Sequence, residues 1–521
     1  MSSSSYVTTL KFKYLDNPFY YIDREPGGQN PSSATNDPKK KDVTSTTTSA
    51  TSSTVSTEKI DVKKSFRFII AIVAILVVFV LAIIFAIMSS FIINNPIRNG
   101  DKVEKLTDIK YPQLKAIRTS LIDPDTPEEV YNLLKRNGKG WTLAFSDEFE
   151  LDGRTFHEGD DQFFTAVDIY YSATHDLEYY LPQMVTTRDS NLEIIFDRAN
   201  HSGLEFVSGM VQSWNKLCFN KRAIVEIRAQ LPYDVKHGLW PAAWSLGNLA
   251  RPGFLATTDG TWPYTYDECD LGTLPNQSTT NEGMSYLPGQ RLSKCACSGE
   301  DHPSPGVGRG APEIDIIEGL YQYDKFWGVQ TLQVAPFDEW WRPDYDYVGI
   351  DNENITIIRE DIGTVYQESI SLGTNLNTSE FHVFTMEYKS SEQDQDSYIT
   401  FAIDGITTFT INGSALHPNQ YIGWRQITKE PMSLVFNLGL SFMWNQDLDT
   451  EELDLPAKFL IDYVRIYQPE GQVEMTCDPV DYPTDQYIRN HKPAYENPNL
   501  TSWKAAGYNF PRNLLLNQCK L

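Results

Sequence analysis

Three acidic residues within one short apolar segment are the strongest chemical signal in the sequence. The segment Ala311–Gly319 reads A-P-E-I-D-I-I-E-G. In a β-strand, Glu313 and Asp315 point to one face, whereas Glu318 has the wrong parity for that face. A single β-bulge in the Ile316–Ile317 pair restores the parity. We therefore expect the three carboxylates to line one surface of a bulged strand.

Carboxylates brought together in this way suit the cleavage of glycosidic bonds. A retaining mechanism needs two carboxyl groups ~5–5.5 Å apart, one as nucleophile and one as acid/base. A third carboxylate between them raises the proton affinity of its neighbours and steadies the nucleophile. An exposed strand edge is the alternative explanation for such charges. It fits less well, because the isoleucines between the acids need a core on the other face.

The elements that must position these acids are short strands. From about residue 139 to 470 the dominant period is two: in Ala223–Ala229, one set of alternate residues is entirely apolar, and the other set is Ile224, Glu226 and Arg228. The segment Ile399–Ile411 reads as a hairpin through Asp404-Gly405, and Phe459–Tyr467 reads as a further strand. Many short strands with Gly, Pro and Asn turns predict an all-β domain, either a sandwich or a barrel.

An apolar run near the N-terminus predicts a membrane anchor. Phe68–Met88 contains 21 uninterrupted apolar residues, enough for a helix to span ~30 Å of hydrocarbon. We place this signal-anchor helix within residues 66–94. Basic residues lie on its N-terminal side, which puts the N-terminus in the cytosol: Lys59, Lys63, Lys64 and Arg67. The sequence therefore predicts a single-pass type II membrane protein of the secretory pathway, in the endoplasmic reticulum, Golgi or plasma membrane.

The segment before the anchor has the composition of a disordered tail. Residues 1–65 include the Ser/Thr-rich stretch Thr44–Thr57, which cannot bury a core. Within this tail, Asn17-Pro18-Phe19 resembles peptides that cytosolic sorting adaptors bind. Asn-Pro is equally a common turn signal, so a turn is the alternative to an adaptor site.

Sequons and cysteines agree with this topology, because all of them follow the anchor. Six N-x-S/T sequons predict glycosylation at Asn200, Asn276, Asn354, Asn377, Asn412 and Asn499. The six cysteines are Cys218, Cys269, Cys295, Cys297, Cys477 and Cys519. An even number on the oxidising side permits disulfides. We expect Cys269 to pair with Cys295 or Cys297, and Cys477 or Cys519 to hold the C-terminal tail.

Three further segments surround or interrupt the strand-rich region. Residues 95–138 look like a stem, in which Pro124–Lys135 carries a helix-start signature with Thr126 as N-cap. Residues 247–310 are rich in Gly, Pro, Asp and Ser and hold three cysteines. We interpret them as a disulfide-rich insertion at the rim of a site. Residues 471–521 look like an extension packed on the domain.

Composition narrows the range of partners. The formal net charge is −25 and aromatic residues make up 12% of the chain. An acidic balance argues against nucleic acid, whose phosphates require clustered Lys and Arg. Tryptophan and tyrosine near acidic groups suit sugars, although most such rings simply fill cores. No HExxH motif, C-x-x-C pair or Gly-rich phosphate loop occurs, so we expect no cofactor and no metal.

The acidic segment resembles the bulged catalytic motif of glycoside hydrolase family 16. Three other segments resemble landmarks of that family, in the same order. Trp141–Phe149 is similar to its opening strand, Gly238–Gly247 to its cleft-wall strand, and Phe459–Tyr467 to its closing strand. The resemblance implies a concave β-sandwich of the jelly-roll type over residues 139–470.

The same resemblance assigns roles to individual residues. It implies that Glu313 is the nucleophile, Asp315 the assisting carboxylate and Glu318 the acid/base. Many members of the family carry histidine near Gln333, which leaves the role of that residue open. Candidate sugar-binding residues are Trp240, Trp244, Trp327, Gln333, Trp340, Trp341, Asn437 and Trp444. Core packing is a serious alternative for Trp244.

A narrower resemblance links the chain to the Skn/Kre group of fungal proteins associated with β-1,6-glucan synthesis. It is carried by the anchor, by R-P-G-F, W-P-Y-T-Y-D-E-C-D and G-V-G-R-G-A-P-E-I-D in the insertion, and by T-C-D-P-V-D-Y-P-T near the C-terminus. The resemblance implies a membrane-anchored glucosidase or transglycosylase that remodels cell-wall β-glucan. The alternative is a non-catalytic protein that binds glucan or acts as a scaffold, with a role in folding or trafficking as a smaller third hypothesis.

Overall fold

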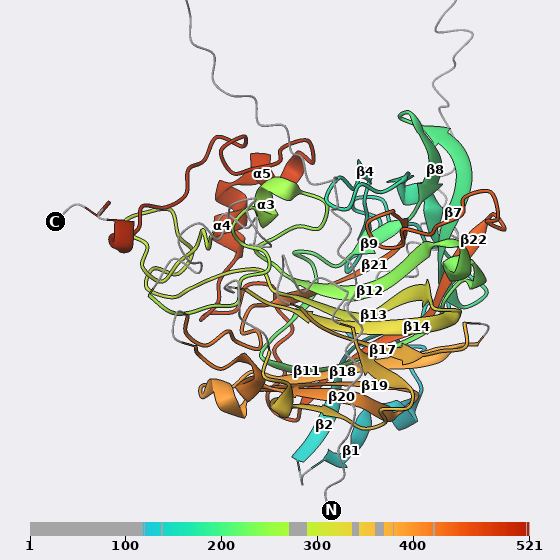
Figure 1. Cartoon of the computed structure of the whole chain (residues 1–521), viewed down its shortest axis with the longest axis horizontal. Coiled ribbons are helices and arrows are strands. Elements are labelled where there is room, and N and C mark those ends of the chain that lie inside the picture. Colours follow the sequence, from blue (N-terminus) through green and yellow to red (C-terminus); the bar gives the residue numbers. More distant parts are fainter. Residues whose placement is uncertain are drawn as a thin grey trace, which may run out of the picture. The chain divides into compact units, whose positions relative to one another are not determined.

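Two β-sheets pack against each other and enclose the largest apolar cluster of the protein (Figure 1). The computed structural model describes residues 118, 120–136, 139–269, 289–335, 343–359, 369–378, 380–419, 422–516 and 518–519. The cluster contains residues from both sheets, among them Val225 and Phe384 from one and Ile314 and Phe436 from the other. The expected two-sheet β-sandwich is thereby confirmed.

The larger sheet, called sheet A here, has 13 strands. Its hydrogen-bonded order is β15 (Val348–Ile350), β20 (Ile406–Asn412), β19 (Tyr398–Ile403), β18 (His382–Lys389), β11 (Arg222–Gln230), β22 (Ala457–Pro469), β7 (Asn191–His201), β8 (Leu204–Ser208), β5 (Glu178–Tyr180) and β4 (Ile169–Tyr170), with β1 (Asn132–Arg136), β2 (Lys139–Asp147) and β6 (Val185–Arg188) attached beside this path.

Sheet B has nine strands. Its order is β16 (Thr356–Ile358), β17 (Ser369–Asn375), β14 (Lys325–Gln333), β13 (Glu313–Gln322), β12 (Leu239–Gly247), β21 (Met432–Leu440), β9 (Met210–Gln212) and β3 (Thr165–Ala166), with β10 (Cys218–Phe219) attached to β21. One face of this sheet contacts the core, and the acidic segment forms its strand β13.

The alternating sequence explains how the strands of sheet A bury one face. In β11, Ala223, Val225 and Ile227 are fully buried, whereas Glu226 and Arg228 on the other face are partly exposed. The predicted hairpin is also confirmed, because β19 pairs with β20. Its turn residues Asp404 and Gly405 both have positive φ, at 52° and 76°. Asp-Gly suits that turn, since these two residues tolerate the left-handed region.

Helices are few and short in the described part of the chain. They are α3 (Leu255–Thr258), α4 (Asp485–Asn490) and α5 (Lys492–Glu496), together with the 3-10 turns η2 (Glu128–Val130), η3 (Pro182–Met184), η4 (Tyr233–His237), η5 (Tyr345–Tyr347), η6 (Asp394–Asp396), η7 (Gly413–Leu416) and η8 (Leu514–Leu516). The C-terminal pair α4 and α5 packs on the insertion in one apolar cluster around the fully buried Trp503.

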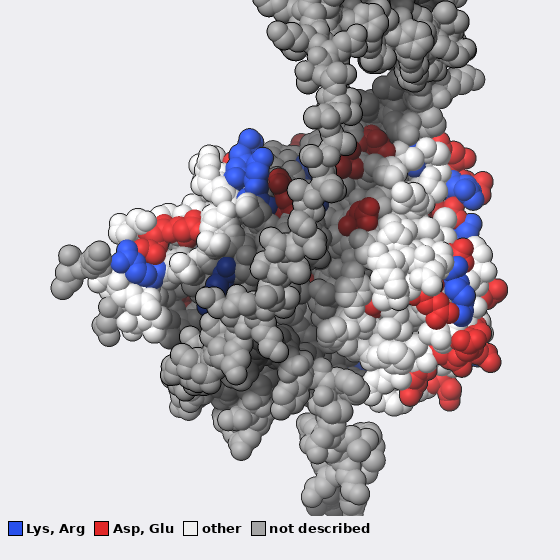
Figure 2. Space-filling view, turned by 90° about the horizontal axis from the view of Figure 1, so that it is seen from above, with Lys and Arg blue, Asp and Glu red and all other residues white. Residues whose placement is uncertain are grey.

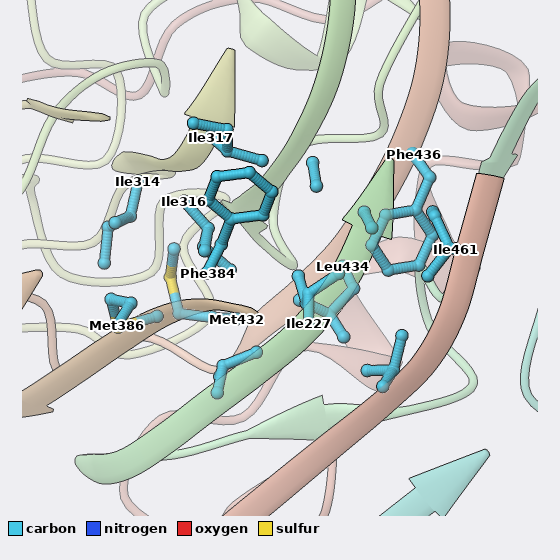
Figure 3. Close-up of a cluster of buried hydrophobic side chains, with 14 of the residues drawn as sticks. Ile227, Ile314, Ile316, Ile317, Phe384, Met386, Met432, Leu434, Phe436 and Ile461 are labelled. Atoms are coloured by element: carbon cyan, nitrogen blue, oxygen red, sulfur yellow. The ribbon is translucent and has the colours of Figure 1, made fainter. Parts of the chain in front are cut away.

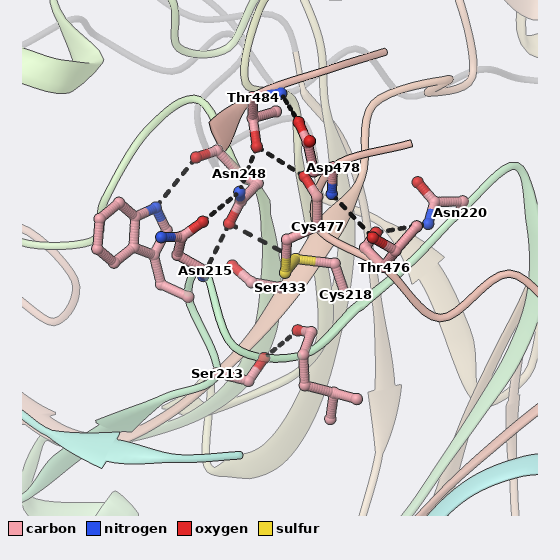
Figure 4. Close-up of a disulfide and its surroundings, with 12 residues drawn as sticks. Ser213, Asn215, Cys218, Asn220, Asn248, Ser433, Thr476, Cys477, Asp478 and Thr484 are labelled. Atoms are coloured by element: carbon pink, nitrogen blue, oxygen red, sulfur yellow. Dashed lines mark hydrogen bonds between the residues drawn. A yellow bond between two sulfur atoms is a disulfide. The ribbon is translucent and has the colours of Figure 1, made fainter. Parts of the chain in front are cut away.

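Three disulfides fix the insertion and the C-terminal extension. Cys218 pairs with Cys477, Cys269 with Cys295, and Cys297 with Cys519. Figure 4 shows the first of these, surrounded by hydrogen bonds that include Thr484 Oγ1 to the Cys477 carbonyl at 2.6 Å. Both expectations about the cysteines are confirmed: Cys269 pairs within the insertion, and both C-terminal cysteines hold the tail.

The segment before residue 139 differs from the prediction. The expected helix over Pro124–Lys135 is wrong: the chain makes only the turn η2 and then enters β1, which pairs with β2. Thr126 does not cap a helix, because its hydroxyl contacts the Ser146 hydroxyl at 2.7 Å. Pairing along β2 offers this segment more hydrogen bonds than an isolated turn of helix does. The sandwich therefore begins before residue 139.

Several predictions lie outside the described residues. They concern the tail 1–65 with its Asn-Pro-Phe motif, the anchor within 66–94 and the sequon at Asn276. Within the described ranges, none of the helices combines the length and apolarity that crossing a bilayer requires. The other five sequon asparagines all have exposed positions: Asn200, Asn354, Asn377, Asn412 and Asn499. On the face seen in Figure 2, acidic side chains gather along one side with basic ones between them.

Removing the disulfide that spans most of the domain should strongly destabilise it. Cys218 and Cys477 are 259 residues apart in sequence, so the bond removes much conformational freedom from the unfolded chain. We expect Cys218→Ala with Cys477→Ala to lower the free energy of unfolding by roughly 3–5 kcal/mol, measured by denaturant titration. The matched control removes Cys269 and Cys295, which are only 26 residues apart. A loss no larger than that of the control would contradict the expectation.

Candidate active site

Strand β13 carries the acidic segment and contains the expected bulge. Toward β12, Trp244 pairs with Asp315 and Ala243 with Ile317, so Ile316 has no partner of its own. Toward β14, the register shifts between Asp315 and Glu318. Two residues of β13 thus lie opposite one residue of each neighbouring strand, as a β-bulge requires. The predicted bulge in the Ile316–Ile317 pair is confirmed.

The bulge divides the strand between the core and the opposite face. Ile314, Ile316 and Ile317 are fully buried and belong to the main core cluster, as Figure 3 shows. The acidic residues point the other way, to the face of sheet B that we call the carboxylate face. There Asp315 and Glu318 retain only 2% and 7% of their accessible surface. The apolar residues of the segment are therefore what orients its acids.

Two protein donors hold the carboxylate of Glu313. The side-chain amide of Gln333 donates to Oε1 at 2.6 Å, and the indole N–H of Trp262 donates to Oε2 at 2.7 Å. The same amide nitrogen of Gln333 donates to Asp315 Oδ2 at 3.0 Å. Gln333 thus bridges two of the three acids from the neighbouring strand β14. Its carboxamide is neutral at every pH, so it donates these bonds whatever the ionisation state of the acids.

Glu318 has a different environment, formed by two stacked tryptophans. The indole N–H of Trp240 donates to Glu318 Oε1 at 2.9 Å. The ring of Trp240 stacks on that of Trp444, with centroids 4.6 Å apart and planes 2° apart. Trp444 is fixed in turn by its N–H, which donates to the Gly319 carbonyl at 3.0 Å. Both rings are half-buried, so part of their surface remains accessible.

Burial raises the pKa of all three acids. For Glu313, burial acts together with the charges of Asp315 and Glu318, and the pKa lies well above its usual range. Burial raises the pKa of Asp315 to about 7. For Glu318, burial and the charge of Asp315 raise the pKa well above its usual range. The group therefore retains protons at neutral pH, because full ionisation would place three charges in a small buried volume.

The donors distinguish Glu313 from Glu318. Two N–H groups point at Glu313, and one points at each of the other two acids. A hydrogen bond to a carboxylate favours its ionised form, so hydrogen bonding favours a charge on Glu313 over one on Glu318. Burial and neighbouring charges oppose ionisation of both, and the pKa of Asp315, at about 7, is raised less than theirs. A retaining mechanism needs one ionised and one protonated carboxyl, and the unequal donors are the feature that distinguishes the two groups.

The other predicted sugar-binding residues divide into three groups. Trp244 is 8% exposed and its N–H donates to Asn437 Oδ1 at 2.8 Å, so both lie within the packed structure. Trp327 is buried in a small cluster with Leu320, Val329 and Trp444. Packing therefore explains Trp244 and Trp327 better than an open sugar platform does. Trp340 and Trp341 lie outside the described residues.

Two residues in and around this site, Trp262 and Tyr180, were not indicated by the sequence. Trp262 was treated only as part of the insertion, although the quoted W-P-Y-T-Y-D-E-C-D motif contains it. Tyr180 is buried and bridges the site to Asp176: its hydroxyl donates to Asp176 Oδ2 at 3.0 Å and accepts from Asn437 Nδ2 at 3.2 Å. Among the described residues, no group of His, Cys, Asp and Glu is arranged to hold a metal ion.

Comparison with known proteins shows the family to which this chain belongs. Residues 31–519 match the family described as beta-glucan synthesis-associated protein SKN1/KRE6/Sbg1. The chain belongs to this family. It is 48% identical over 435 residues to the beta-glucan synthesis-associated protein KRE6 of Saccharomyces cerevisiae, covering 81% of this chain and 59% of that protein. It is 47% identical over 463 residues to SKN1 of Candida albicans, covering 85% and 62%. The chain thus spans less than two thirds of the length of these family members.

Solved structures resemble this member of the SKN1/KRE6/Sbg1 family only loosely. An endo-beta-1,3-glucanase from Pyrococcus furiosus has 19% identity and a TM-score of 0.40, over 65% of this chain and 98% of that one. The laminarinase catalytic domain from Thermotoga maritima has 19% identity and a TM-score of 0.38, over 63% and 98%. Scores at this level carry no conclusion about the family's chemistry, which must come from the residues themselves.

Neutralising one of the buried acids should stabilise the fold in a pH-dependent way. Because the pKa of Asp315 is about 7 when folded, against 3.8 ordinarily, its ionisation opposes folding increasingly as the pH rises from about 4 to 7. We expect Asp315→Asn to raise the free energy of unfolding by roughly 1–4 kcal/mol at pH 8 and by little at pH 4. Thermal melts at both pH values measure this. Glu451→Gln, at an exposed position, is the control; an equal effect of Asp315→Asn at both pH values would contradict the expectation.

Proposed function

We propose that this protein is a retaining glycosidase or transglycosylase that acts on β-glucan. The observation that carries the proposal is the pair of unlike carboxyl groups on β13. Glu313 is held by two N–H donors that favour its charge, and Glu318 is buried beside a single indole donor. Both project from the same face of one bulged strand.

The first step of the proposed reaction forms a covalent intermediate. Glu318 gives its proton to the glycosidic oxygen, and the bond between that oxygen and the anomeric carbon breaks. A carboxylate oxygen of Glu313 forms a bond to the same carbon, so its negative charge is consumed. Asp315 shares the Gln333 amide with Glu313 and thereby keeps the nucleophile in place.

The second step decides between hydrolysis and transfer. Glu318, now ionised, takes a proton from an incoming hydroxyl, whose oxygen attacks the anomeric carbon and releases Glu313. Water as the acceptor gives hydrolysis, and a hydroxyl of a second sugar chain gives transglycosylation. Transfer is the proposed physiological outcome, because the relatives are named for β-glucan synthesis, which hydrolysis alone does not serve. Cell-wall β-1,6-glucan is the proposed product.

The proposed setting is the lumenal or extracellular side of a secretory membrane. Three disulfides suit an oxidising compartment, and five sequon asparagines occupy exposed positions where glycans can be attached. The apolar run Phe68–Met88 would anchor the chain, with Asn17-Pro18-Phe19 available to cytosolic adaptors. The acidic surface fits a neutral polysaccharide, which brings no phosphate charge to be neutralised.

A non-catalytic glucan-binding or scaffold role is the second candidate. It is favoured by one observation: both oxygens of the Glu313 carboxylate accept hydrogen bonds from the protein itself. Each oxygen keeps a second lone pair that can attack, but the bonds to Trp262 and Gln333 weaken as the negative charge of Glu313 is consumed. In a binding protein the same bonds would simply neutralise a buried acid.

Variants of the two acids distinguish the candidates. In a retaining enzyme, Glu313→Gln and Glu318→Gln should each reduce turnover of unactivated glucan at least ~1,000-fold. Only Glu318→Gln should keep a rapid first step with a substrate whose leaving group needs no proton. The measurements are product analysis with the full-length protein and rescue of wall glucan in cells that lack the native protein. Full rescue by Glu313→Gln at wild-type abundance would support the scaffold role instead. Glu451→Gln is the matched control.

Removing the indole donor of the insertion should shift the pH profile. The Trp262 N–H bond favours the ionised form of Glu313, so Trp262→Phe should raise the pKa of Glu313 further above its usual range. The acidic limb of the pH–activity profile should then move to higher pH. Trp214→Phe removes another indole bond, to the Asn248 carbonyl at 3.0 Å, and should leave the limb unmoved. An identical profile for both variants would remove Trp262 from the proposed site.

A further inference from the structure

A row of paired residues crosses the carboxylate face of sheet B beside the acids. Starting at Asp315 on β13, the direct partners are Trp244 on β12, Val435 on β21, Gln212 on β9 and Thr165 on β3. Neighbouring strands lie ~4.8 Å apart, so each step along the row moves by that distance from the acids. A polysaccharide that continued across the strands in this direction would have to lie over these residues.

The whole row is buried. The exposed fraction is 8% for Trp244, 0% for Val435, 2% for Gln212 and 7% for Thr165. Residues on the sheet face of an open binding surface would keep more accessible area, above all a tryptophan offered as a sugar platform. Another part of the chain must therefore cover the row.

Two segments provide this cover. The first runs over residues 165–180 and contributes Val167, Ile169 and Tyr180, and the second is the start of the insertion, which contributes Phe254 and Trp262. These side chains form one apolar cluster with concealed residues of the sheet, Ala242, Trp244, Leu246 and Val435. The two segments also touch each other, since a Cβ added to Gly253 would lie 2.1 Å from Ile169 Cδ1.

The cover is held by buried hydrogen bonds at its base. Glu178, which is fully buried, accepts the backbone N–H of Leu440 at 3.1 Å. The backbone N–H of Leu177 donates to the Leu440 carbonyl at 2.9 Å. On the other segment, the backbone N–H of Ala311 donates to the Thr261 carbonyl at 2.8 Å. These bonds tie both segments to the ends of β21 and β13, so the cover belongs to the fold.

The cover reaches the acids themselves. Trp262 is the part of the cover that reaches the acids, and its indole N–H donates to Glu313. Tyr171 lies nearby on the first segment, where burial and the charge of Glu313 raise the pKa of its phenol. Along this row the face of the sheet is thus closed from Trp244 on β12 to Thr165 on β3, directly beside the proposed nucleophile.

We propose that the site takes the end of a glucan chain and does not admit a chain that continues past the acids in both directions. This inference rests on the proposed function for the identity of its ligand. A chain threaded across the face would need the space that Ile169, Tyr180 and Phe254 fill. One end of the sugar chain therefore stops at the cover, while the other end leaves past the partly accessible rings of Trp240 and Trp444 beside Glu318.

The direct test is binding of end-tagged glucans to the full-length Glu313→Gln protein, which cannot turn over the ligand. The probes are linear oligosaccharides of β-1,3-linked and of β-1,6-linked glucan. Each is prepared in four forms: untagged, with a bulky tag at the reducing end, with the tag at the non-reducing end, and with a tag at both ends. We expect the untagged chain and one or both singly tagged chains to bind, and the doubly tagged chain to bind at least ~10-fold more weakly. Equal binding of the doubly tagged chain overturns the inference, as does a lack of binding by every probe.

Turnover by the wild-type protein separates this inference from the proposed function. End-directed action should release one product size, with little loss of viscosity for each bond cut in a long glucan. Cuts spread evenly along the chain would overturn the inference and leave the proposed chemistry intact. Tag-dependent binding without any turnover would support the inference about chain ends and contradict the proposed chemistry.

A variant that opens the cover provides a positive control. Ile169→Ala with Tyr171→Ala removes two covering side chains that make none of the hydrogen bonds described for the acids. It should raise the affinity for the doubly tagged chain at least ~10-fold relative to the parent Glu313→Gln protein. Ile406→Ala, at an exposed position on sheet A, should not. If the opened variant proves unstable in thermal melts, the tag pattern of the parent protein still decides the question.

Discussion

The bulge at Ile316–Ile317 is the constraint on which the site depends. Without it, a regular strand would place Glu318 in the core and Ile317 on the carboxylate face. The bulge lets three isoleucines enter the core cluster and leaves all three acids on the other face. Burying the isoleucines stabilises the fold by about 1.5–3 kcal/mol for each side chain. This helps to offset the cost of holding carboxyl groups together where little solvent reaches them.

That cost shapes the surroundings of the acids. Isolated buried charges are unfavourable by many kcal/mol, so each acid must keep its proton or find donors. The protein supplies donors unequally, two for Glu313 and one for each of the others, and this inequality favours a charge on Glu313 over one on Glu318. Aromatic N–H groups make two of these bonds. An indole can donate from an otherwise apolar ring, so it stabilises charge without bringing in water.

Much of this arrangement could be read from the sequence, and the failures have physical causes. The alternation in β11 and the Asp-Gly turn of the β19–β20 hairpin are local signals, as is the parity break in β13, and the structure agrees with them. The helix predicted at Thr126 did not form. The residues around Thr126 satisfy the local rules for a helix start, but the segment that follows pairs with β2, which is a non-local interaction. For the same reason, the sequence left the role of Trp244 open between a sugar platform and core packing, and gave no role to Trp262. Strand parity put Trp244 on the correct face but gave no information about what covers that face. No local pattern indicated that the insertion returns to Glu313.

The insertion is therefore part of the site, and the disulfides that hold the insertion also help to hold the site. Trp262 lies between β12 and Cys269, and the disulfides Cys269–Cys295 and Cys297–Cys519 connect the insertion to itself and to the C-terminal extension. Closing long loops in this way limits the unfolded chain and keeps the insertion on the domain, where its indole reaches the carboxylate. Arg291, buried within the insertion, adds a cation–π contact with Trp503 of the extension at 4.3 Å. The last fifty residues are far from the acids in sequence, yet they support the segment that covers them. The disulfides of the insertion therefore also stabilise the position of the indole that donates to Glu313.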